Sequence, residues 1–234
     1  MSDPRDIRLT ELLGILSEVS EPAVFNPWFE YDPEYDASQQ APEIRRLQLR
    51  QYLAERFRSA EFLLIAEALG YQGGHFTGIA MTSERILLGH KSREGPRPSD
   101  VFRGRTPLRT SKPSVKSRGF SENTATIVWK TLHSLNLDPY RVVLWNVFPW
   151  HPFDPKNGML SNRTPGREEF QRAQSALEQF LRLFPESRVV AVGNHAAEML
   201  ESMGNSLIHL RHPAHGGAAD VKQGVADLTG KVEE

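Results

Sequence analysis

The sequence contains a series of short, almost continuous apolar runs. Strands that are buried on both faces of a parallel sheet have this length and composition. The pattern is clear in EFLLIAE (61–67), RVVLWNV (141–147) and SRVVAVG (187–193), and weaker in SLIHLRH (206–212). The sequence therefore predicts four strands.

Segments with a spaced apolar pattern lie between these runs. The clearest spans 165–184, where apolar residues form one stripe, Thr164 is placed to cap a helix and Pro165 suits its first turn. Further helices are expected at 43–57, 123–137 and 194–203. Strands alternating with helices predict a three-layer α/β/α fold with a central, mostly parallel four-stranded sheet. We expect residues 1–234 to form one domain.

Composition narrows the class of protein. The chain is 39% hydrophobic and 24% charged, which is typical of a soluble globular protein. It has no cysteine, which excludes disulfides, thiol nucleophiles and cysteine-ligated zinc or iron–sulfur clusters. No apolar run approaches the roughly 20 residues of a membrane helix, and the first residues lack the layout of a signal peptide. We expect a cytoplasmic protein, acting at the bacterial nucleoid.

Charge is unevenly distributed along the chain. The net charge of the whole chain is −1, yet residues 90–120 hold nine Lys and Arg against two acidic residues, together with four prolines. Such a long basic loop insertion is either a solvated, flexible insertion or an arm that contacts nucleic-acid phosphates. In the second case, the DNA-binding residues would be Arg103, Arg105, Arg109, Lys112, Lys116 and Arg118.

Polar residues follow the predicted strands at their carboxyl ends, where open α/β sheets bind ligands. The residues expected at this edge are Glu67, Gln72, Asn146, His151, His212 and His215. Each alone is also compatible with an ordinary turn or loop position. The histidines lack the spacing of a known zinc motif, so no metal and no other cofactor is expected.

Three motifs in order resemble the uracil-DNA glycosylase superfamily. They are AEALG (66–70) with GIAMTS (78–83) after the first strand, Asn146 in LWNVFP, and RHPAHGG (211–217) after the last strand. The resemblance covers about residues 60–217. It implies an enzyme that needs no cofactor and hydrolyses the N-glycosidic bond of uracil flipped out of single- or double-stranded DNA. It also implies a monomer.

The resemblance assigns two roles directly. Asn146 would read the Watson–Crick edge of uracil through its amide, and His212 would stabilise the departing uracil anion at O2. The iron–sulfur branch of the superfamily is excluded because the chain has no cysteine.

Other family positions are changed in this chain. An aspartate that positions water in one branch aligns with Ala68, so Glu67 or Gln72 would take that role, or the backbone alone would hold the water. A base-stacking phenylalanine aligns with Met81, which leaves Met81, Phe76, Phe148 or Trp150 for stacking.

The tyrosine that excludes thymine in one branch aligns with Gly70, and Tyr71 beside it is a substitute. His215 is a candidate contact to the product's sugar or phosphate. These changes keep two alternatives open: a non-catalytic protein that binds uracil or abasic sites in DNA, and a glycosylase for another damaged base.

Overall fold

A four-stranded parallel sheet forms the centre of the structure, a computed structural model that describes residues 4–213 and 217–230. Its strands lie in the order β3 (Val142–Phe148), β2 (Phe62–Ala68), β5 (Arg188–Val192) and β6 (Leu207–Leu210), and all three neighbouring pairs are parallel. All seven residues of β3 are buried. The four strands predicted from the apolar runs are confirmed, with ends that differ by one or two residues.

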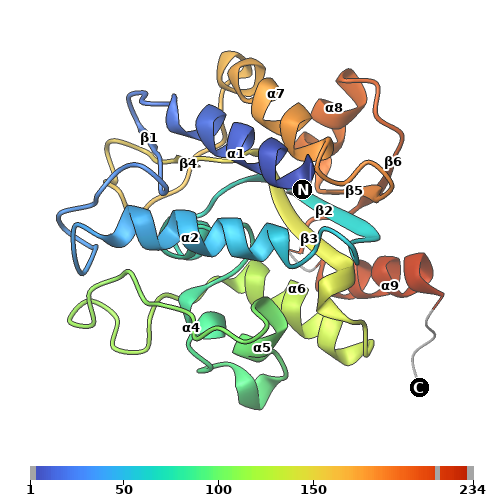
Figure 1. The fold of residues 1–234 in the computed structure, drawn as a ribbon, viewed down its shortest axis with the longest axis horizontal. Coiled ribbons are helices and arrows are strands. Elements are labelled where there is room, and N and C mark those ends of the chain that lie inside the picture. Colours follow the sequence, from blue (N-terminus) through green and yellow to red (C-terminus); the bar gives the residue numbers. More distant parts are fainter. Residues whose placement is uncertain (1–3, 214–216, 231–234) are drawn as a thin grey trace.

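Helices cover both faces of the sheet (Figure 1). The upper layer in that view holds α1 (Pro4–Ser17), α7 (Arg167–Leu181) and α8 (Asn194–Ser202), and the lower layer holds α4 (Glu84–Leu87), α5 (Pro98–Val101) and α6 (Asn123–Ser134). The remaining long helices are α2 (Ala41–Ala54) and α9 (Ala218–Thr229), which packs against α6 and β6. The three-layer α/β/α fold is therefore confirmed.

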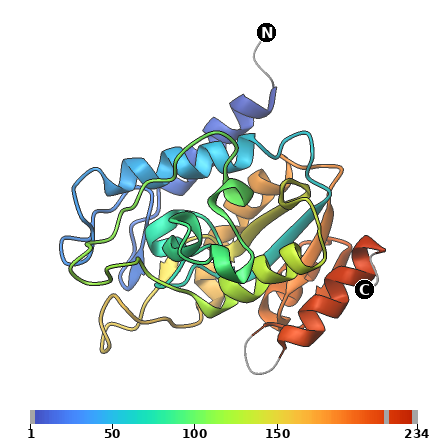
Figure 2. The ribbon, with the colours of Figure 1, turned by 90° about the horizontal axis from the view of Figure 1, so that it is seen from below.

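Helix α2 lies along the outer edge of β3. Its Tyr52 hydroxyl accepts a hydrogen bond of 2.9 Å from the backbone N–H of Leu144. This bond satisfies a donor that an edge strand would otherwise leave unpaired. Figure 2 shows α1 and α2 side by side on one flank and α9 on the opposite side of the molecule.

Helix α7 begins later than the sequence pattern suggested. It starts at Arg167, and the backbone N–H of Gly166 donates a 2.6 Å hydrogen bond to the Glu169 carboxylate. The proposed cap at Thr164 and first turn at Pro165 are wrong, because both residues precede the helix. A carboxylate in the first turn satisfies the free N–H instead.

Short elements connect the sheet to its helices. They are β1 (Val24–Phe25), which pairs antiparallel with β4 (His151–Pro152), α3 (Gly74–Thr77), and the 3₁₀ turns η1 (Ser92–Glu94) and η2 (Pro139–Arg141). Within the described ranges, no helix is long and apolar enough to cross a membrane.

The basic segment 90–120 is anchored to the core by one buried carboxylate. Glu84 accepts backbone N–H bonds of 3.0 Å from Thr110 and Ser111 and of 3.3 Å from Phe120, and a further bond from the Ser111 hydroxyl. Ionic acceptors of this kind form strong hydrogen bonds. The segment is thus held close to α4 and is not a loosely attached insertion.

Candidate functional site

Two adjoining cavities lie where the sheet strands end. The first, which we call the Glu122 cavity, has a volume of about 320 Å³ and includes Glu67, Gly70, Glu122, Asn162, Arg163 and His212 in its wall. The second, the His195 cavity, has a volume of about 620 Å³ and includes Glu67, Asn194, His195, His209, Arg211 and His212. Glu67 and His212 belong to both, so the structure brings together two of the residues predicted for this edge.

Glu67 is paired with a histidine that the sequence analysis did not select. His195 Nδ1 lies 2.6 Å from Glu67 Oε2, and both side chains are partly exposed. The hydrogen bond and the negative charge of Glu67 raise the pKa of His195. His195 is the second residue of α8 and was visible only as part of the GNH stretch that follows a predicted strand.

A glycine lets His212 come close to the end of β5. Gly193 has a φ of +94°, which L residues rarely adopt, and a Cβ built there would lie 3.2 Å from His212 Cβ. The backbone of the loop therefore packs directly beneath His212, on the floor between the two cavities.

Glu122 is the second carboxyl group of the site. It immediately precedes α6, and burial raises the pKa of its carboxyl to about 7. Its Oε2 atom is enclosed and has no hydrogen-bond partner among the described residues. A Cβ at Gly73 would overlap this oxygen, and one at Gly70 would lie 3.6 Å from Oε1.

The loop after β2 is tied to the segment that carries Asn162. The backbone N–H of Tyr71 donates a 3.0 Å hydrogen bond to Asn162 Oδ1. The next residue, Arg163, forms two 2.7 Å hydrogen bonds with Glu169, which fix this segment to α7. Gly70 and Asn162 thereby face each other across the Glu122 cavity.

Asn146 is buried within β3, with 2% of its surface exposed. It is in register with Ala66, so side-chain alternation places it on the face of the sheet opposite to Glu67. Its Oδ1 atom has no hydrogen-bond partner in the part of the chain that the structure describes. The buried amide therefore has an unused acceptor, although Asn146 does not line either cavity among the described residues.

The residues proposed for base stacking lie in the core. Phe76 stacks on Phe120 with ring centroids 4.1 Å apart, and Phe148 packs edge-on against Trp150 at 5.3 Å. Met81 is 3% exposed. As far as the described residues show, none of these side chains lines the Glu122 or the His195 cavity.

The remaining edge candidates are placed differently. His151 follows the carboxyl end of β3, but it is fully buried in β4 and lines neither cavity among the described residues. Its Nε2 donates to the Ser161 carbonyl at 2.8 Å, so its Nδ1 accepts from His75 at 3.0 Å, and burial lowers the pKa of His151 to about 3. Gln72 is half-buried and is not among the residues that line the two cavities, and His215 lies outside the described residues.

Two basic residues of the 90–120 segment hold its own fold together. The Arg109 guanidinium donates to the carbonyls of Ser111 and Ser117, each at 2.8 Å. Lys112 Nζ donates to the carbonyls of Pro33 and Glu34 at 2.7 and 2.8 Å. Both cations are thus engaged within the protein.

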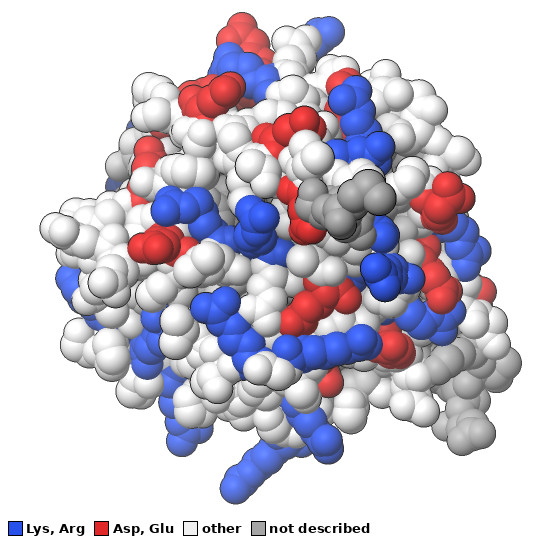
Figure 3. Space-filling model, in the orientation of Figure 1, with Lys and Arg blue, Asp and Glu red and all other residues white. Residues whose placement is uncertain are grey.

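The other four predicted DNA-binding residues of the segment are exposed. Arg103 lies 3.7 Å from Asp138, and Arg105 donates to the Gln51 side chain at 3.0 Å. Lys116 and Arg118 lie on an exposed stretch that leads to Glu122. In Figure 3, basic and acidic side chains are interspersed over most of the face shown, with basic side chains projecting at its lower edge.

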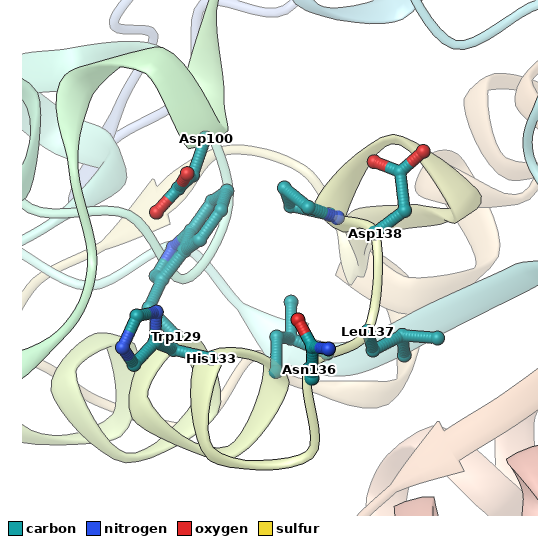
Figure 4. A pocket seen from close by; sticks show the side chains of 8 residues that line it. Asp100, Trp129, His133, Asn136, Leu137 and Asp138 are labelled. Carbon is teal, nitrogen blue, oxygen red and sulfur yellow. The ribbon is translucent and has the colours of Figure 1, made fainter.

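A further cavity, of about 280 Å³, is shown in Figure 4. Asp100, Trp129, His133 and Asp138 are among its lining residues, around the end of α6 and the start of η2. Because η2 leads into the first residue of β3, this cavity lies at the opposite edge of the sheet from Glu67. Across the described ranges, no group of three His, Asp or Glu side chains is placed to hold a metal ion.

Comparison with known proteins identifies the class. The model of the uracil DNA glycosylase superfamily matches residues 93–226, which is more than half of the chain. The protein is thus a DNA glycosylase, with DNA as its partner. The chain belongs to the uracil DNA glycosylase superfamily, which confirms the resemblance to that superfamily.

A solved structure supports the fold. The crystal structure of wild-type Pedobacter heparinus SMUG2 matches with a TM-score of 0.59 and 11% sequence identity, over 96% of this chain and 99% of that chain. At this identity the match concerns the fold. No curated protein matches the sequence of the chain.

Proposed function

We propose that this glycosylase hydrolyses the N-glycosidic bond of uracil that is flipped out of DNA and leaves an abasic site. The observation that carries the choice of uracil is the unused acceptor of Asn146, since a buried amide oxygen without a partner costs about 1–3 kcal/mol. A base that supplies a donor there removes this cost when it binds.

The chemistry of the base edges favours uracil over cytosine. Uracil presents an N3–H donor beside the O4 acceptor, which matches the oxygen and the NH₂ group of an amide. Cytosine presents an acceptor at N3 and a donor at N4, and it therefore opposes the same amide orientation. For this contact, the base must reach Asn146 from the Glu122 cavity.

The carboxyl edge of the sheet supplies groups for hydrolysis. A water oxygen bonds to C1′ of the sugar while the C1′–N1 bond breaks and its electron pair leaves with uracil. His212 donates a hydrogen bond to O2 of the departing anion. Glu67 orients the water and takes its proton, with Oε2 held by His195 and Oε1 free to accept from the water.

Exposed cations flank this edge. Arg118 precedes Glu122 by four residues, which a chain spans in at most about 14 Å. We infer that Arg118, and Lys116 two residues before it, contact the phosphates next to a base in the Glu122 cavity. We also propose that the chain forms a single domain and acts as a monomer.

The test is base release from a 5′-labelled oligonucleotide with one uracil, resolved after alkaline cleavage. Single-stranded, U·A and U·G substrates are compared. We expect release by the natural protein, a loss of about 10²–10³-fold in His212→Ala, and a loss of about 10²–10⁴-fold in Glu67→Gln. His90→Ala, which alters an exposed histidine that lines neither cavity, is the matched control and should retain the natural rate.

Other outcomes contradict the proposal in distinct ways. Release that persists in His212→Ala would remove that histidine from the mechanism. Binding of the uracil oligonucleotide without release would indicate a DNA-binding protein. Release of thymine, hypoxanthine or another damaged base in place of uracil would indicate a different substrate.

A further inference from the structure

We propose that Glu122 is a base-contacting residue, whose carboxyl group binds a carbonyl oxygen of the flipped-out base. This inference rests on the proposed function, because it names a further group through which the same site recognises its substrate. It concerns a residue outside the three motifs that resemble the superfamily.

The position of Glu122 has no evident use in stabilising α6. Glu122 is the N-cap residue, where a short polar side chain normally accepts a hydrogen bond from the first turn. Its side chain makes no such bond. Glu122 instead forms part of the wall of the cavity that Glu67 and His212 also line.

The glycine-rich loop is shaped around this carboxyl group. A side chain at Gly73 would overlap Glu122 Oε2, and one at Gly70 would come within 3.6 Å of Oε1. The loop therefore lets the carboxyl group reach the cavity wall.

The Oε2 atom of Glu122 is buried and has no partner among the described residues. Burial favours the protonated acid, which is neutral and presents an O–H donor. The other charged or titratable groups of the cavity are Glu67, Arg163 and His212, and Arg163 is paired with a carboxylate of α7. Burial is accordingly the cause of the raised pKa of Glu122.

An amide group lies beside Glu122. Asn162 Oδ1 accepts from Tyr71, and the Nδ2 and Oδ1 atoms of Asn162 would lie 3.7 and 3.9 Å from a Cβ at Gly70, while the side chain also interacts with His151. The wall of the cavity therefore holds the Asn162 amide beside the carboxyl group of Glu122. The complement of the protonated carboxyl group is a carbonyl oxygen, which has two lone pairs and can accept from Glu122 in addition to His212 or Asn146.

The test compares Glu122→Gln, which keeps the size and a donor but cannot ionise, with Glu122→Ala and Gly73→Ala. Affinity is measured for one oligonucleotide carrying either non-cleavable 2′-fluorodeoxyuridine or an abasic-site analogue, and single-turnover uracil release is followed from pH 6 to 9. We expect Glu122→Ala and Gly73→Ala to lose about tenfold in affinity for the fluorodeoxyuridine DNA, equal to about 1.4 kcal/mol. Their affinity for the abasic DNA should not change.

The pH profile separates a base contact from a structural role. Release by the natural protein should decline as pH rises through about 7, where Glu122 ionises, while Glu122→Gln should keep its rate beyond that point. Equal profiles, or an equal loss of affinity for both DNAs, would overturn the inference. If the natural protein releases no uracil, the proposed function fails, and the two affinities still decide whether Glu122 contacts the base.

Discussion

Nδ1 of His195 lies 2.6 Å from Oε2 of Glu67, which joins the start of α8 to the end of β2 at the mouth of two cavities. The pair fixes one carboxylate oxygen and leaves the other for a ligand. Such a second group that orients a catalytic base is common in hydrolytic sites. In the proposed mechanism, His195 is therefore a positioning residue for Glu67.

The pKa of His195 should depend on Glu67. Removing the charge in Glu67→Gln should lower the pKa of His195 towards its ordinary value, because the hydrogen bond and charge that raise it are lost. The measurement is an NMR titration of the His195 ring protons. The ion pair stabilises the folded protein fully at pH values below the unfolded pKa of His195, and this stabilisation is lost as pH rises through the folded pKa. An unchanged titration in Glu67→Gln would show that the two side chains do not interact in solution.

The salt dependence of the affinity for DNA should show whether Lys116 and Arg118 contact phosphates. In the double variant Lys116→Gln and Arg118→Gln, the slope of log affinity against log salt should fall by about 2, since each phosphate contact contributes about 0.9. Arg172→Gln, on α7, is the matched control for charge. Deleting the whole segment would be a poor test, because Thr110 and Ser111 bind Glu84 in the core. An equal change in slope for all variants would exclude a specific role for the two cations.

The stability of the protein should decrease between about pH 4.5 and pH 7 because of Glu122. Its folded pKa of about 7 is above the unfolded value of 4.5, so the folded state binds more protons in this window and the free energy of unfolding falls as pH rises. The difference between these two pKa values corresponds to about 3 kcal/mol of the free energy of unfolding. Urea unfolding at pH 5 and pH 8 should show that the change in the free energy of unfolding with pH is less favourable in the natural protein than in Glu122→Gln by about this amount, because His151 and the other titrating groups are common to both proteins. Parallel changes in the two proteins would contradict the assignment.

His151 should make the fold sensitive to acid. Its folded pKa of about 3 is below the ordinary 6.5, so the unfolded chain takes up the proton first and stability falls as pH drops below about 6.5. The expected slope from this residue is about 1.4 kcal/mol per pH unit. His151→Gln, which can keep the bond to Ser161, should have a shallower slope between pH 6 and pH 4 in urea unfolding. His90→Gln, at an exposed histidine, should keep the natural slope.

The sheet was predictable because its strands are continuous apolar runs, whereas two helices were missed for different reasons. In α1, Leu9, Leu12 and Leu16 are buried with a helical spacing, so the signal was present in the sequence and was overlooked. In α9 the apolar pattern is interrupted by Gly224, where a Cβ would collide with the Leu210 side chain. Close packing requires that glycine at the cost of helix propensity, and only the structure shows it.

The candidate site was predictable in part. Strand ends place Glu67 and His212 at one edge, as their sequence positions indicated. The pairing of Glu67 with His195 depends on how α8 is oriented, which no local pattern encodes. Glu122 carries no local signal either, because its burial arises from glycines that lie about 50 residues earlier in the chain.

The carboxylate of Glu84 closes the basic segment into a loop, since it binds both Ser111 and Phe120. Ser114, which lies between these two residues, is exposed. The hydrogen bonds at the two ends of the stretch keep the loop closed. The chain has no cysteine, so Ser114→Cys would introduce a single thiol. A fluorophore attached there would lie within a few residues of Lys116 and Arg118. The fold thus provides an optical reporter position from which the arrival of a DNA strand can be followed in real time, without disturbing the carboxyl edge of the sheet.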